Sequence, residues 1–115
     1  MPERLTVANA LGLPDWLGDR PTTLVGRLFV TEQFAYLATT DDAPVGVLIY
    51  EPKLAATFLR RFPAGGGSAI LYWGDGTVNG LLRSGTALPM FPRMLHSISE
   101  VVFEQDGHPA ELVRL

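Results

Sequence analysis

From Thr22 onward the chain alternates apolar with other side chains at a period of two, and this pattern constrains the fold more than any other feature. A period of two is typical of a β-strand, because successive side chains point to opposite faces of a sheet. Residues 22–31 follow it, and 34–39 is predicted to be the next strand. A turn cluster at 40–44 precedes a third predicted strand at 45–50, which is apolar on both faces, as expected of a central strand. We expect these three segments to form an antiparallel meander.

A helical period interrupts the strands at 51–62. Apolar side chains recur there at intervals of three and four, with Pro52 in the first turn and Arg60 and Arg61 in the last. This spacing predicts the main amphipathic helix over 52–62. A shorter helix is predicted within 5–17, with Thr6 as its N-cap.

The second half of the chain again predicts strands and turns. We expect a strand at 69–73, a hairpin turn at 74–77 and a return strand at 78–83. Residues 99–105 and 110–115 flank Asp106 and Gly107, which are typical of a second hairpin. Pro89 and Pro92 predict an irregular connection over 86–97, with a turn of helix at 93–97.

Together these elements predict a single α+β domain over residues 1–115. It comprises a helical arm at 1–20 and a β-rich body at 21–115. The body is expected to be a largely antiparallel sheet of about six or seven strands with helix 52–62 packed on one face, and the arm to hold the short N-terminal helix. The alternative is a small closed or half-open β-barrel that is plugged by this helix.

The chain carries few side chains suited to catalysis. It has no cysteine, one lysine and two histidines, whereas nucleophilic and acid–base mechanisms draw mainly on these residues. His96 and Glu100 are the catalytic candidates, since a helix would place them one turn apart. No histidine spacing matches a metal site, and the glycine run before Ser68 lacks the strand-to-helix context of a phosphate loop. The sequence therefore predicts no metal and no cofactor.

Apolar residues make up 47% of the chain, and some lie where the predicted elements offer no core to bury them. The proline-broken segment 88–95, the segment 13–17 and an edge strand at 110–115 are the main cases. The residues predicted to form an interface are Leu13, Trp16, Leu17, Met90, Phe91, Met94, Leu95 and Leu112. These features favour a non-catalytic protein-interaction or regulatory module that acts as a homodimer, with the edge strand available for strand addition between subunits.

Two other functions stay open. The first is a small-molecule-binding domain with an aromatic pocket between the sheet and the helix, for which the candidate residues are Arg27, Tyr36, Tyr50, Tyr72, Trp73 and Arg83. The second is a small enzyme that uses His96 and Glu100. A net charge of −3 with scattered arginines predicts no nucleic-acid partner. The lack of cysteine and of any apolar run near 20 residues predicts a soluble, cytoplasmic protein with no membrane segment.

Overall fold

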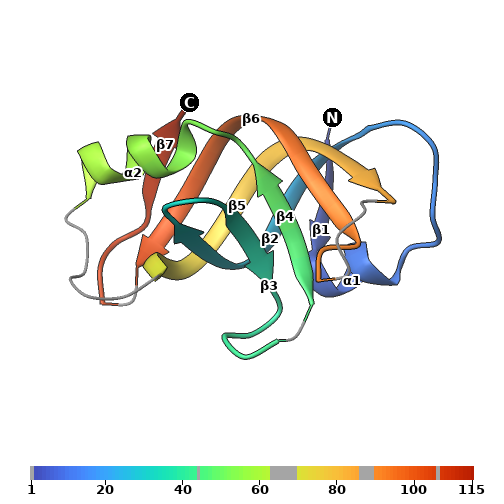
Figure 1. Ribbon diagram of the computed structural model, residues 1–115, viewed down its shortest axis with the longest axis horizontal. Coiled ribbons are helices and arrows are strands. Elements are labelled where there is room, and N and C mark those ends of the chain that lie inside the picture. Colours follow the sequence, from blue (N-terminus) through green and yellow to red (C-terminus); the bar gives the residue numbers. More distant parts are fainter. Residues whose placement is uncertain (1, 44, 63–69, 86–89, 106) are drawn as a thin grey trace.

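The structure is a computed structural model, and it describes residues 2–43, 45–62, 70–85, 90–105 and 107–115. Within them the chain forms a seven-stranded sheet and two helices (Figure 1). The elements are β1 (Glu3–Thr6), α1 (Val7–Gly12), β2 (Arg20–Thr31), β3 (Ala35–Ala38), β4 (Gly46–Tyr50), α2 (Leu54–Arg61), β5 (Ile70–Ser84), β6 (Arg93–Gln105) and β7 (Glu111–Arg114).

Five of the strands close into a barrel. Their order is β2-β3-β4-β6-β5, and β5 pairs again with β2 along twelve residue pairs from Arg20↔Leu82 to Thr31↔Ile70. The interior is filled by the inward-facing side chains of every strand, among them Leu28, Leu37 and Leu95, which are fully buried. The barrel considered as the alternative from the sequence is therefore the architecture that forms.

The predicted meander is confirmed, because β2, β3 and β4 pair antiparallel in chain order. The expectation of a largely antiparallel sheet was wrong, because the sheet is mixed: β1 runs parallel to β2, and β4 runs parallel to β6. The second parallel pair has a topological cause. The chain leaves β4 through α2 and β5 before β6 returns beside β4, and such a crossover brings two strands together in the same direction.

The predicted hairpin at 74–77 was also wrong, because 70–84 is one continuous strand. Gly74 and Gly76 are needed for close packing and not for a turn. A Cβ atom on Gly76 would lie 2.7 Å from the Cβ of Leu28, and one on Gly74 would meet the backbone carbonyl of Glu104. Glycine at such positions lets a strongly coiled strand approach its neighbours closely enough to close a small barrel.

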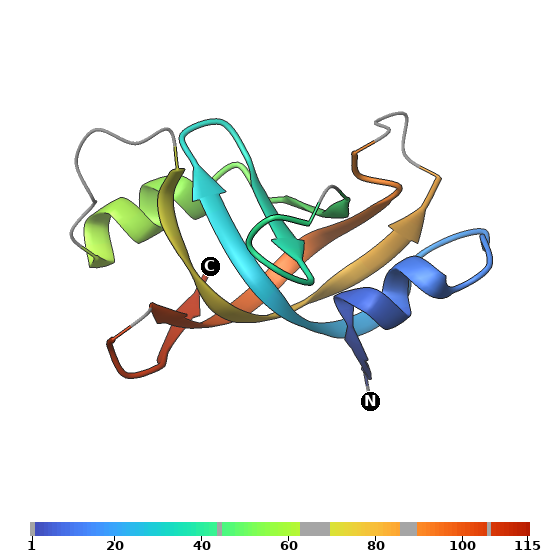
Figure 2. The ribbon, with the colours of Figure 1, turned by 90° about the horizontal axis from the view of Figure 1, so that it is seen from below.

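Both helices are short: α1 has six residues within the predicted 5–17, and α2 has eight within 52–62, so the expectation of one main amphipathic helix was wrong. They lie at opposite ends of the barrel (Figures 1 and 2). The α2 end is closed by an inner aromatic cluster of Phe58, Phe62, Tyr72 and Phe103, whose ring centroids lie 5.2–6.4 Å apart. The hydroxyl of Tyr72 donates to the carbonyls of Phe58 and Phe62, at 3.1 and 2.7 Å, and so fixes the last turn of α2.

The α1 end is closed by α1 and the segment that follows it. Thr6 is the N-cap of α1, as predicted, and its hydroxyl accepts from the backbone N–H of Asn9. Arg93 is buried beneath this end, and its guanidinium donates to the carbonyl of Leu13 and to the carboxylate of Asp15, both at 2.6 Å. Segment 13–19 is thereby held on the barrel of its own chain.

The connection predicted to be irregular over 86–97 becomes strand β6 at Arg93, so no helical turn forms at 93–97. β6 then pairs antiparallel with β7, and Gly107 has φ 83°, the left-handed conformation expected of the second hairpin turn. The glycine run before Ser68, residues 86–89 and Asp106 lie outside the described residues. Neither of the described helices is long and apolar enough to cross a lipid bilayer.

Candidate functional site: an aromatic surface on the barrel wall

A row of large apolar side chains crosses the outer wall of the barrel. The row follows the strand register, since Trp73 pairs with Phe29, Phe29 with Tyr36, Tyr36 with Leu48, and Leu48 with Met94. These residues alternate along their strands with the buried core residues, so their side chains point outward. An outward row of this kind is unusual, because the outer face of a small barrel in water is normally polar.

Four rings on this wall form a second aromatic assembly, separate from the core, which we call the outer aromatic cluster: Phe29, Phe34, Tyr36 and Phe91. Phe29 and Tyr36 are stacked, with centroids 5.0 Å apart and planes 17° apart. Phe34 stacks on Tyr36 at 5.8 Å, and Phe91 meets both of them at 5.5–6.0 Å. Phe34 remains 43% exposed, so the cluster presents a ring to the surroundings.

Local hydrogen bonds fix the two connections that supply rings to the cluster. The hydroxyl of Thr31 accepts from the N–H groups of Gln33 and Phe34 and donates to the carbonyl of Phe34 at 2.8 Å. The connection before β6 is tied to β4, because the carbonyl of Met90 accepts from the N–H of Gly46 at 3.1 Å. Phe34 and Phe91 are thus held by short, bonded segments on the barrel frame.

Beside the cluster lies a groove of about 410 Å³, which we call the aromatic groove. Its lining residues are Gln33, Phe34, Leu48, Ile49, Tyr50, Glu51, Pro52 and Phe91. Tyr50 is 58% exposed, and with Phe34 it gives the groove two accessible ring faces. Most of the lining is apolar, which is typical of sites that bind a ligand by contact area.

Next to the aromatic groove lies a smaller hollow of about 40 Å³, which we call the acidic hollow. The two share Gln33, Phe34, Glu51 and Pro52, and the hollow adds Glu32. Its two carboxylates make it a place where a cation would be stabilised. Neither lining includes a lysine or an arginine among the described residues.

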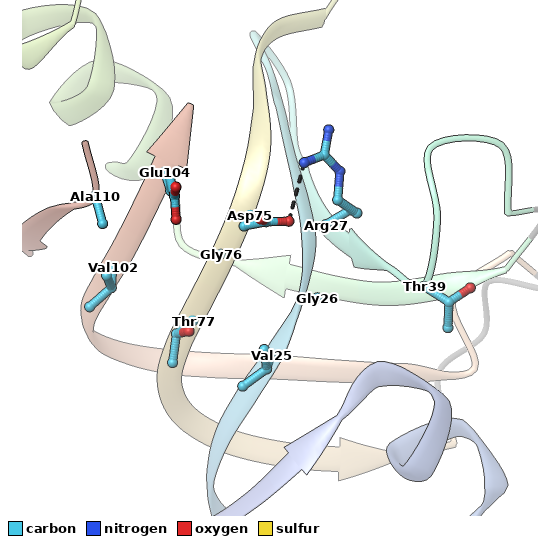
Figure 3. A pocket seen from close by; sticks show the side chains of 10 residues that line it. All are labelled: Val25, Gly26, Arg27, Thr39, Asp75, Gly76, Thr77, Val102, Glu104 and Ala110. Atoms are coloured by element: carbon cyan, nitrogen blue, oxygen red, sulfur yellow. Dashed lines mark hydrogen bonds and ion pairs between the residues drawn. The ribbon is translucent and has the colours of Figure 1, made fainter. Parts of the chain in front are cut away.

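A further pocket of about 350 Å³ lies on the outer surface of β2, β5 and β6 (Figure 3). Asp75 lies between Arg27 and Glu104 in the strand register. The guanidinium of Arg27 bonds Asp75 at 3.1 Å and Asp41 at 2.7 Å, so its charge is already matched within the chain. This pocket therefore offers an arginine that is already paired with two aspartates and not a strong site for an anion.

The predicted interface residues are divided among three environments. Leu17 and Met90 are exposed, as is Leu112 on β7, and Met94 belongs to the outer row. Leu13 and Trp16 pack against the core of their own chain, and the guanidinium groups of Arg20 and Arg93 lie 5.0 and 5.1 Å from the centroid of the Trp16 ring. Leu95 is fully buried inside the barrel and Phe91 is 9% exposed within the outer aromatic cluster, so neither side chain offers a wide surface.

The residues proposed for a small-molecule pocket do not converge on one place. Tyr50 lines the aromatic groove and Tyr36 lies in the adjoining cluster, where burial raises the pKa of its hydroxyl. Trp73 extends the outer row, whereas Tyr72 lies in the inner cluster. Arg27 bonds Asp41 and Asp75, and Arg83 bonds Asp19.

His96 and Glu100 are separated by an irregularity in β6. Register with β5 passes from Asn79↔Glu100 to Leu81↔His96, and Ser97 between them has φ 52°. His96 instead contacts the carboxylate of Asp19 at 2.9 Å and the hydroxyl of Ser97 at 3.0 Å.

The Asp19 carboxylate next to His96 is also bonded to Arg83. Hydrogen bonds from Arg83 and His96 lower its pKa to about 2, and Arg83 bonds both of its oxygens. Neither His96 nor Ser97 is among the lining residues of the aromatic groove, the acidic hollow or the pocket of Figure 3. We therefore interpret this group as a tie between segment 13–19 and the barrel. The described residues also hold no group of three histidine, aspartate or glutamate side chains placed to bind a metal ion.

Phe29 and Phe34 were missed as site residues by the sequence reasoning. The predicted strands 22–31 and 34–39 contain Phe29 and Phe34, but their ranges do not indicate that the two rings belong to one cluster. Only the fold brings them together, because Phe91 arrives from a connection more than fifty positions later. The sequence signal that could have indicated the cluster is an outward-facing aromatic residue in each of two adjacent strands, Phe29 in β2 and Tyr36 in β3.

The chain has no significant match among protein-family models, curated proteins or solved structures.

Proposed function

We propose that this chain is a non-catalytic binding module that takes a protein partner on the outer aromatic cluster and the aromatic groove. The observation that carries the proposal is a four-ring cluster assembled outside the core, with Phe34 and Tyr50 exposed beside it. Exposed aromatic side chains on a rigid frame are typical of protein interfaces, since they supply contact area at a low cost in conformational entropy.

The architecture supports a binding role. A five-stranded barrel with the order β2-β3-β4-β6-β5 and a helix after its third strand resembles the OB-fold. That fold binds ligands on the face of its second and third barrel strands, between two of its loops. Here that face is β3 and β4, and the flanking connections carry Phe34 and Phe91. The resemblance concerns position alone, because a fold does not fix the ligand.

Charge favours a protein over a nucleic acid. The linings of the groove and hollow contain Glu32 and Glu51 and no described basic residue. The nearest arginine along β2, Arg27, is bonded to two aspartates. Because nucleic-acid affinity depends on neutralising phosphates with cations, this surface is a poor match for DNA or RNA.

The test is capture of a partner from the native host by the tagged chain, followed by reconstitution with the purified partner. We expect Phe34→Ser and Tyr50→Ser to weaken the reconstituted complex at least about tenfold, and the matched control Leu17→Ser to leave it unchanged. Equal binding by all four proteins would overturn the proposal. A small aromatic metabolite that stabilises the chain, with no partner protein found, would favour the small-molecule alternative instead.

We further propose that the module acts as a homodimer through β7. Two observations favour this. In the described residues β7 pairs with β6 only, and Leu112 on it lies exposed opposite Val102. An edge strand with exposed apolar residues can pair with its copy. Light scattering at micromolar concentration should give twice the 12.5 kDa mass of one chain, and Leu112→Lys should return it to one. A monomeric wild-type mass would overturn this second proposal.

A further inference from the structure

We infer that the segment bound in the aromatic groove is a proline-rich stretch in the polyproline II conformation that carries a lysine or arginine at one end. This inference rests on the proposed function and names the class of partner. It follows from three properties of the groove and the acidic hollow: the ring faces, the free hydrogen-bond donors and the sign of the charge.

The ring faces match a polyproline II ligand. Phe34 and Tyr50 present exposed rings, and Pro52 lies in the same lining. Proline-rich segments dock in aromatic-lined grooves, where the pyrrolidine rings pack on flat side chains. Because such a segment is already extended before binding, it loses little conformational entropy in a shallow groove.

The hydrogen-bond donors of the groove also match a polyproline II ligand. A polyproline II segment makes no internal hydrogen bonds, so its carbonyl groups need donors from the partner. The groove offers the amide of Gln33 and the hydroxyl of Tyr50, and neither side chain is bonded to another described residue. Both can therefore donate to the carbonyls of a bound segment without breaking a bond within the chain.

The acidic hollow favours a basic residue in the bound segment. Glu32 and Glu51 line it, and Glu51 is held by the backbone N–H of Lys53, which donates to its Oε1 at 3.1 Å. The hollow adjoins the aromatic groove, since the two have four lining residues in common. A basic side chain at the end of the bound segment would thus reach two carboxylates, and an acidic one would be repelled.

The test is an NMR titration of the isotopically labelled chain with a synthetic peptide that holds two Pro-x-x-Pro units followed by one arginine. We expect saturable shifts at Gln33, Phe34 and Tyr50. Replacing the prolines of the peptide with alanine should weaken binding at least about tenfold, and so should replacing its arginine with glutamate. In the protein, Phe34→Ser and Glu51→Gln should weaken binding, and the control Leu17→Ser, at an exposed position that lines neither the groove nor the hollow, should not. Dispersed spectra of each variant would establish that it folds.

Four outcomes would overturn the inference: no shifts at millimolar peptide, shifts confined to residues outside the groove, equal binding of the alanine peptide, and equal binding of the glutamate peptide. Its failure can be told apart from that of the proposed function. If a captured partner still depends on Phe34 while the proline peptide does not bind, the function stands and the inference falls. Salt-sensitive binding of single-stranded DNA to the groove would overturn both the proposed function and the inference.

Discussion

The guanidinium of Arg93, the first residue of β6, donates to the carbonyl of Leu13, 80 positions earlier in the chain, at 2.6 Å. The same group reaches the carbonyl of Ala10 in α1 at 3.4 Å. Carbonyl groups at the end of a helix have no partner within the helix, so a buried arginine that serves them holds the N-terminal segment in place. This single side chain joins α1 and segment 13–19 to the barrel.

Arg93→Met should lower the free energy of unfolding by about 2–4 kcal/mol, because it removes the donors from buried carbonyls and keeps most of the apolar stem. Chemical denaturation with urea measures the loss. Arg83→Met is the control. Arg83 forms a bidentate pair with Asp19 at a half-exposed position, so its loss should cost less. Equal losses in the two variants would contradict the role given to Arg93.

Gly76→Ala should destabilise the barrel by about 1–3 kcal/mol, because the new Cβ would press on Leu28 in the interior. Gly12→Ala is the matched control: nothing lies within 4 Å of its Cβ position at the end of α1, and alanine favours a helix. We expect the control to be neutral or to gain up to about 1 kcal/mol. Thermal unfolding of both variants would test the pair, and a tolerated Gly76→Ala would mean that the strands do not need this close approach.

Asp19 should make the free energy of unfolding depend on pH between about 4 and 2. Hydrogen bonds from Arg83 and then His96 lower its pKa from 3.8 to about 2 in the folded chain. A lowered pKa means that the ionised carboxylate stabilises the fold at pH values above about 4, and that this contribution is lost as the pH falls toward about 2. Denaturation midpoints across this range should decline more steeply for wild type than for Asp19→Asn. Parallel curves would falsify the assignment.

Tyr72→Phe should cost about 1–2 kcal/mol, because the ring is kept while the carbonyls of Phe58 and Phe62 lose a buried donor. The effect should be concentrated in α2, whose last turn depends on these bonds. Hydrogen exchange of α2 amides is the measurement, and we expect faster exchange there than in β2. Uniform acceleration across the chain would show that the hydroxyl supports the whole core and not the helix in particular.

His96→Ala should leave partner and peptide binding unchanged, since His96 lines neither the aromatic groove nor the acidic hollow. Its expected effect is a looser segment 13–19, because the contact with Asp19 is lost. The same NMR titration measures both. A loss of binding equal to that of Phe34→Ser would contradict the separation of the two sites.

Local patterns predicted the elements whose signal lies within a few residues. The period of two predicted β2, and short apolar segments bounded by turn signals predicted β3 and β4 and their antiparallel pairing. Thr6 was identified as the cap of α1 from its side-chain chemistry. The turn signal at Gly74–Thr77 failed because glycine serves both turns and close strand packing. Which of the two applies depends on which side chain lies against Gly76, and that side chain belongs to Leu28, 48 positions away.

The candidate site likewise combines features that local sequence predicts with features that depend on distant residues. The sequence alone established a β-rich chain with scarce catalytic side chains and an excess of apolar ones. Only the tertiary structure decided where that excess lies: Leu95 inside the barrel, Trp16 against its own chain, and Phe29, Phe34, Tyr36 and Phe91 together on the outer wall. The physical reason is barrel closure. Pairing β5 with both β2 and β6 fixes which face of every strand is inside, and no short window of sequence contains that information.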